Sequence, residues 1–130
     1  MDKNTKITLN ELMRRKEQML EAKRQKKTRE LYVESLGGVI TIEEPTRELV
    51  NDCREMSKNG GDGDAYIIYQ CVKEPNLKDP ELLRAFECAE PSEIVGRIFE
   101  PGEIGALSQE IVMLAGYGIN AVQRVERIKN

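Results

Sequence analysis

The sequence contains no histidine and no tryptophan, and only 5% of its residues are aromatic. Without histidine the commonest general base is missing, and no Ser-His-Asp or Cys-His arrangement can form. Acidic residues are plentiful, but most of them occupy helix starts or solvated faces, where capping and the helix dipole explain them. Ser108 has no base to activate it. We therefore expect a protein that is not an enzyme and that needs no cofactor.

Cysteines are few, and none of them forms a C-x-x-C pair. Cys53, Cys71 and Cys88 lie far apart in a chain without histidine, so an ordinary zinc site is excluded. We expect these residues to be apolar, buried thiols in a reducing compartment, with no bound metal.

Long hydrophobic stretches are also missing. No run approaches the ~20 apolar residues of a membrane span, and the N-terminus lacks the apolar core of a signal peptide. We expect a soluble, cytoplasmic protein. At 130 residues the chain is long enough for one folded domain.

Charge is distributed unevenly along the chain. Residues 1–30 contain ten Lys and Arg against five Asp and Glu, whereas residues 31–130 contain ten against eighteen. We predict a basic N-terminal helical segment at residues 1–28 and a single globular domain at residues 29–130.

The basic segment has the pattern of a helix with a narrow apolar stripe. Thr8 is a predicted N-cap, with Glu11 closing a capping box, and no Gly or Pro follows from Leu9 to Lys27. A stripe this thin cannot hold a helix firmly to a core, so we expect a helix that is mobile or ordered by a partner. The predicted partner-binding residues are Leu9, Leu12, Met13, Met19 and Leu20.

Several interpretations of this segment remain open. It could be a solvated, loosely docked helix, or it could contact an acidic protein surface, a partner helix or a second copy of the chain. Nucleic-acid binding is disfavoured because no aromatic residue interrupts the basic run. Membrane binding is disfavoured because the apolar face lacks Trp and Phe.

The sequence of the globular domain predicts a hairpin followed by short helices that are separated by prolines. Two β-rich runs surround Gly37-Gly38 and predict a hairpin at about 31–43. The densest apolar run, Tyr66 to Val72, follows a predicted N-cap at Asp64, and Asp79-Pro80 marks another helix start. The predicted fold is mainly α (α+β), a small antiparallel hairpin packed on five or six short helices. The predicted helices span about 46–58, 64–74, 80–87, 91–99, 103–115 and 119–128.

These turns and helix starts also carry a family resemblance. The sequence is similar to the XkdN-like phage tail assembly chaperones in Y-I-I-Y-Q-C-V-K-E-P-N-L at 66–77, D-P-E-L at 79–82, E-P-S-E-I-V at 90–95, F-E-P-G-E-I at 99–104 and L-A-G-Y at 114–117. The S-L-G-G-V-I-T-I run at 35–42 resembles the family's hairpin. The resemblance covers about residues 30–130.

The resemblance implies a cytoplasmic, non-catalytic assembly factor of a phage or prophage. Such a chaperone binds the long, helical tape-measure protein, assists tail-tube assembly and is not part of the finished tail. The alternative from the residues alone is a DNA-associated regulatory protein that uses the basic N-terminal segment.

Overall fold

A computed structural model describes residues 4–118 and 120–126 of the chain. The chain separates into two units, residues 1–26 with 118–130, and residues 27–117. We call residues 4–26 the arm and residues 27–117 the body. The arm contains α1 (Leu9–Arg14) and α2 (Lys16–Arg24).

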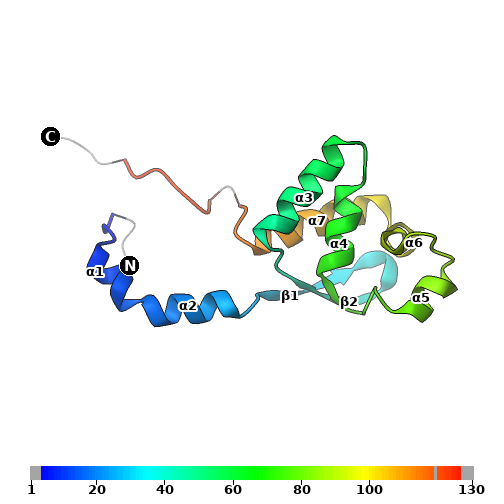
Figure 1. Ribbon diagram of the computed structural model, residues 1–130, viewed down its shortest axis with the longest axis horizontal. Helices are drawn as coiled ribbons and strands as arrows, with labels where there is room; N and C mark the ends of the chain where they lie inside the picture. The colour runs from blue at the N-terminus through cyan, green and yellow to red at the C-terminus, as the bar shows by residue number, and fades with distance from the viewer. Residues whose placement is uncertain (1–3, 119, 127–130) are drawn as a thin grey trace. The chain divides into compact units, whose positions relative to one another are not determined.

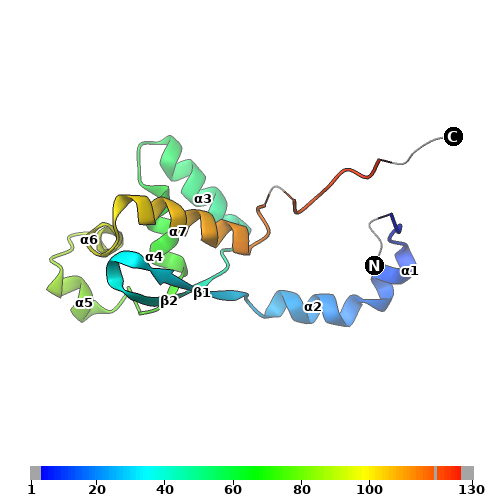
Figure 2. The ribbon, with the colours of Figure 1, turned by 180° about the vertical axis from the view of Figure 1, so that it is seen from behind.

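The body begins with a hairpin and continues as short helices. Its elements are β1 (Thr28–Val33), the 3-10 turn η1 (Glu34–Leu36), β2 (Gly38–Glu43), α3 (Arg47–Lys58), α4 (Gly63–Cys71), β3 (Val72–Glu74), α5 (Pro80–Ala85), η2 (Pro91–Glu93), α6 (Ile94–Ile98) and α7 (Pro101–Leu114). Figures 1 and 2 both show α4 between α3 and α6. This confirms the predicted α+β fold with a small antiparallel β element and five short helices.

The sheet has three antiparallel strands in the order β1-β2-β3. Thr28 pairs with Glu43 and Val33 pairs with Gly38, so the hairpin closes through η1 and Gly37, whose φ of +62° favours glycine. One face of the sheet is buried, with Ile42 fully buried, and α7 packs against β1 and β2.

The core is centred on α4, as its dense apolar sequence predicts. This helix packs against α3, α6 and α7, and it buries Ile67, Ile68 and Cys71. Ile94 of α6 and Ile111 of α7 complete the centre and are fully buried. No polar or charged side chain is buried among the described residues.

Two predicted helix starts are confirmed by hydrogen bonds. The Thr46 hydroxyl accepts from the Leu49 N–H at 3.1 Å, which caps α3. An Asp79 carboxylate oxygen accepts from the Glu81 N–H at 2.8 Å, and Pro80 occupies the first position of α5.

The predicted boundaries of α4 are wrong at both ends. Asp62, rather than Asp64, is the N-cap, and its carboxylate accepts from the Ala65 N–H at 2.9 Å. The helix ends at Cys71, because Val72–Glu74 leaves it to pair with β2. A β-branched residue at position 72 suits that strand.

Two further predictions need correction. The helix predicted at 103–115 begins two residues earlier, at Pro101, where the carboxylates of Glu100 and Glu103 form a capping box. The helix predicted at 119–128 is not present at residues 120–126, and positions 119, 127 and 128 lie outside the described residues. Val122 is 89% exposed there, so its side chain adds little packing that could stabilise a helix at these residues.

Polar contacts join the hairpin to α7. A Glu103 carboxylate oxygen accepts from the Ser35 hydroxyl at 2.6 Å, and the other accepts from the Ser35 N–H at 3.0 Å. Arg29 forms an ion pair with Glu110 at 3.1 Å. Hydrogen bonds to its carboxylate lower the pKa of Glu103; the Ser35 hydroxyl contributes most, and the N–H groups of Glu100 and Ser35 contribute less. The turn of the hairpin is therefore held by the first turn of the last helix.

Candidate partner-binding surface on the arm

The arm has an apolar surface that it does not bury. Neither α1 nor α2 contains a buried residue. Each of the five predicted partner-binding residues is exposed, from 45% for Leu12 to 76% for Leu9. Exposed leucine and methionine side chains gathered on one short segment are typical of a protein–protein contact surface.

Four of the five predicted residues lie together around one groove. Leu12, Met13, Met19 and Leu20 line it with Lys16, and its volume is about 300 Å³. We call this the arm groove. Leu9 is not among its lining residues. The groove includes residues of both α1 and α2. The single helix predicted for this segment is wrong at Arg15, where α1 ends and α2 has not yet begun.

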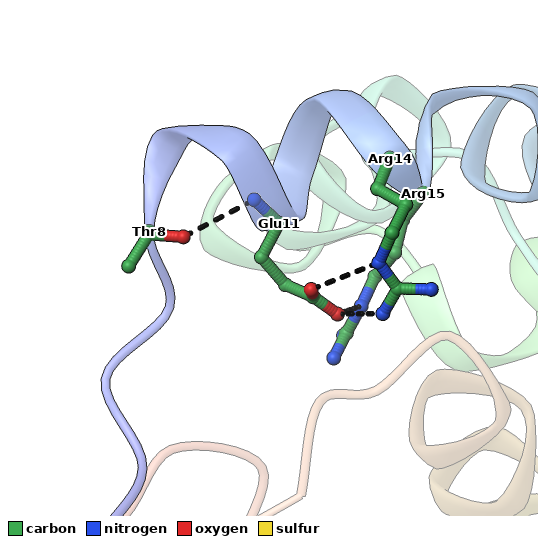
Figure 3. Close-up of polar contacts among 4 residues, drawn as sticks. All are labelled: Thr8, Glu11, Arg14 and Arg15. Carbon is green, nitrogen blue, oxygen red and sulfur yellow. Dashed lines mark hydrogen bonds and ion pairs between the residues drawn. The ribbon is translucent and has the colours of Figure 1, made fainter.

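Local hydrogen bonds and ion pairs form the first helix of the arm. The Thr8 hydroxyl accepts from the Glu11 N–H at 3.2 Å, which confirms the predicted N-cap (Figure 3). The Glu11 carboxylate, which we expected to close a capping box, accepts from Arg14 Nε at 3.1 Å and from Arg15 Nε at 2.7 Å. These contacts fix α1 without any support from a hydrophobic core.

The same contacts set the electrostatics of the arm. Hydrogen bonds from Arg14 and then Arg15 hold the pKa of Glu11 below its usual range. In α2, Arg24 pairs with Glu21 at 3.1 Å. Carboxylates therefore offset part of the arm's positive charge, and Lys16 places a cation at the edge of the arm groove. The arrangement suits an apolar side chain of a partner more than a bare anion.

Sequence reasoning missed two features of possible binding surfaces. Ile7 is 48% exposed in the arm, and its position just before the N-cap Thr8 is the position of a hydrophobic staple. The second is a larger groove in the body, of about 540 Å³, which we call the body groove. It is lined by Val50, Cys53, Arg54, Ser57, Lys58, Gly63, Asp64, Ile67, Ser108 and Val112. Two neighbouring helices, α3 and α4, build it together with α7, which is distant in sequence, so no local pattern could have revealed it.

The cysteines have the character of core residues. Cys53 and Cys71 are buried as predicted, Cys88 is half-buried, and none of the three forms a disulfide. The pKa of Cys53 is raised to about 11, mainly by burial of the thiol and to a smaller extent by the negative charges of Asp52 and Asp64. The thiol is therefore protonated at neutral pH and poorly nucleophilic.

Neither a metal centre nor a membrane span is found in the described part of the chain. Across residues 4–118 and 120–126, no three Cys, Asp and Glu side chains are grouped to hold a metal ion. No helix within those ranges combines the length and apolar character that crossing a membrane requires.

Comparison with known proteins identifies a family. The family model that describes the phage XkdN-like tail assembly chaperone proteins matches residues 9–129. No curated protein and no solved structure matches the chain. The family match includes both helices of the arm as well as the whole body, whereas the sequence resemblance began only near residue 30.

Proposed function

The chain belongs to the phage XkdN-like tail assembly chaperones, and we propose that it binds the tape-measure protein and assists assembly of the tail tube without catalysis. The observation that carries this proposal is the arm groove. Leu12, Met13, Met19 and Leu20 form an apolar contact surface outside the core. We propose that this surface holds an amphipathic helical segment of the tape-measure protein before the tail is complete.

The chemistry of the arm groove supports transient binding to long helical segments. Methionine side chains adapt to differently shaped apolar partners, which suits a protein that must contact many segments of one client. The arm helices have no buried residue, so a partner can contact them without displacing part of the core. Helix-in-groove binding through residues spaced three and four apart is the corresponding recognition mode.

Replacing the four groove residues with glutamine tests this proposal. Glutamine keeps helix propensity close to that of leucine and methionine but removes the apolar contact. A fully buried leucine or methionine contributes about 1.5–3 kcal/mol, and about 1.4 kcal/mol corresponds to a tenfold change in affinity. The quadruple variant should therefore bind the tape-measure protein at least ~10-fold more weakly in a titration with purified full-length proteins.

Leu36→Gln provides the matched control. Leu36 and Leu12 are both 45% exposed, but Leu36 lies in η1 of the body. Circular dichroism should show equal helix content in wild type and quadruple variant. Full affinity in the quadruple variant, or an equal loss in Leu36→Gln, would contradict the assignment of the arm groove.

The DNA-binding alternative is weakened by the ion pairs of the arm. Arg14, Arg15 and Arg24 contact carboxylates within the arm, which reduces the positive potential available to phosphates. We propose that the protein shows no salt-dependent binding to random duplex DNA. A shift of the duplex at low salt that disappears at high salt would favour the regulator instead.

We further propose that the protein acts in the host cytoplasm and leaves before the tail is finished. An assembly factor that holds a client only transiently is not retained in the product. Mass spectrometry of purified phage particles should therefore detect the tube and tape-measure proteins but not this chain. Its presence at stoichiometric amounts would identify a structural subunit.

A further inference from the structure

One face of α3 forms a wall of the body groove. The five α3 residues that line the groove are spaced at i, i+3, i+4, i+7 and i+8, which is one side of a helix: Val50, Cys53, Arg54, Ser57 and Lys58. The facing walls come from α4 and α7, and α4 packs against both α3 and α7 (Figures 1 and 2). The groove is therefore built on the most firmly packed helices of the body.

The floor of the body groove is apolar and fixed by a glycine. Val50, Cys53 and Ile67 are buried at its base. At Gly63, a Cβ atom would lie 2.2 Å from the Cys53 carbonyl oxygen, so only glycine allows α4 to approach α3 this closely. Because the Cys53 thiol stays protonated, it adds no charge to the floor.

Two cations border this apolar floor. Arg54 and Lys58 are exposed, stand one turn apart on α3, and form no ion pair with any residue in the described ranges. Like charges at this spacing repel each other on a helix. Residues 31–130 contain eighteen acidic residues against ten basic ones, yet none of the described acids forms an ion pair with Arg54 or Lys58.

Arg54 is oriented by an aromatic ring. Its guanidinium carbon lies 5.7 Å from the centroid of the Tyr117 ring. A guanidinium that stacks on a ring keeps its N–H edge available for a carboxylate, and stacking restricts the side chain beforehand. Across the groove, Asp64 accepts a hydrogen bond from the Ser108 hydroxyl at 2.7 Å, so that carboxylate is engaged with α7.

We propose that the body groove is a second docking site and that it binds an amphipathic helix of the client with an acidic edge. Aliphatic side chains of that helix contact the floor at Val50 and Ile67, and a carboxylate binds between Arg54 and Lys58. A helix is favoured because the walls are themselves helices, which offer ridges and grooves rather than a strand edge. This inference rests on the proposed function, since it takes the tape-measure protein as the client.

Peptides from the client test the charge and shape of the occupant. Overlapping 20-residue peptides covering the tape-measure protein would be titrated against the full-length chain by fluorescence polarisation. The tightest binders should be amphipathic with acidic residues along one edge. Arg54→Glu with Lys58→Glu should weaken their binding by at least ~10-fold, and changing the peptide's acidic edge to lysine should restore affinity for this double variant.

Two controls make the charge effect specific. Arg47→Glu with Arg84→Glu changes the net charge by the same amount at exposed positions outside the body groove, and this variant should bind the peptides as wild type does. Equal unfolding midpoints among these variants establish that the body is intact.

The outcomes separate this inference from the proposed function. If full-length client binds but no peptide does, or if both charge-reversed variants lose equal affinity, the body groove is not a docking site and the proposed function stands. If peptides bind the body groove and the arm variant holds the client normally, the arm assignment fails instead. Absence of binding by peptides and by full-length client overturns both.

Discussion

The arm and the body use helices in two different ways. Each body helix from α3 to α7 except α5 contains buried residues, whereas α1 and α2 contain none. In the arm, a Thr8 cap and the contacts of Glu11 and Glu21 with arginines stabilise the helices locally. The body helices are held mainly by tertiary packing around α4. Helix-forming sequence is common to both, and what separates them is the width of the apolar face.

This difference assigns different roles to similar side chains. A leucine or isoleucine in the body contributes to the free energy of unfolding, while one in the arm is available for a partner. Under the proposal above, the exposed apolar residues of the arm form a contact surface rather than reflecting poor packing. The following substitutions each test this difference between the arm and the body.

The largest effect is expected at the centre of the body. Ile111→Ala removes a fully buried side chain of α7 and should lower the free energy of unfolding by about 2–5 kcal/mol. Leu9→Ala in the arm removes a side chain that is mostly exposed and should change it by less than ~0.5 kcal/mol. Urea unfolding monitored by circular dichroism measures both. Similar losses would show that the arm is part of the folded core.

A smaller loss of stability is expected at the contact between α3 and α4. In Gly63→Ala the new methyl group would meet the Cys53 carbonyl and the Ser57 hydroxyl, and overpacking of this kind costs about 1–3 kcal/mol. Gly105→Ala is the matched control, because no atom lies within 4 Å of its Cβ position in α7. That change should stabilise the body by up to ~1 kcal/mol. Equal responses would refute the close approach of the two helices.

The contact of Glu103 with Ser35 predicts a pH dependence of body stability. Because the pKa of Glu103 is lowered in the folded state, its contribution is present above the unfolded pKa and is lost as pH falls through the folded value. Glu103→Gln should therefore lower the urea midpoint at pH 7, and this effect should shrink as pH falls through the folded pKa of Glu103. Ser35→Ala should raise the pKa of Glu103, measured by NMR titration of its side chain. A pH-independent difference would contradict this account.

The smallest effect on stability is expected from the corresponding carboxylate in the arm. The pKa of Glu11 is lowered by Arg14 and Arg15, so protonation should weaken α1 as pH falls through that lowered value. The Cα chemical shifts of residues 9–14 should lose helical character, and Glu11→Gln should remove the pH dependence. The urea midpoint of the body should not respond to Glu11→Gln. A shift of that midpoint would couple the arm to the body.

Sequence patterns predicted the features that depend on neighbouring residues. The Thr8, Thr46 and Asp79 caps, the hairpin and the family followed from short motifs. The choice of Asp62 over Asp64 as a cap did not, because both aspartates precede the same apolar run. Likewise, Val72 leaves α4 only because β2 offers a partner strand.

The two candidate sites differ in the same way: the arm groove depends mainly on neighbouring residues, and the body groove depends on the packing of helices. Four of the five arm residues lie around one groove because α1 and α2 preserve most of the helical spacing. The break at Arg15 and the separation of Leu9 from the groove were not predictable from an apolar stripe alone. The body groove combines residues of three helices, and its position becomes evident only when those helices are packed.

The hydrogen bonds between Ser35 and Glu103 also have a consequence for synthesis of the chain. The two residues are 68 positions apart, and the Arg29–Glu110 pair is separated by 81. At about 5–20 residues per second, a ribosome makes the hairpin turn roughly 3–14 s before the helix that holds it. During that interval β2, with Ile40 and Ile42, lacks its contacts with α7. The hairpin therefore gains the contacts that hold its turn only after nearly the whole body has been synthesised.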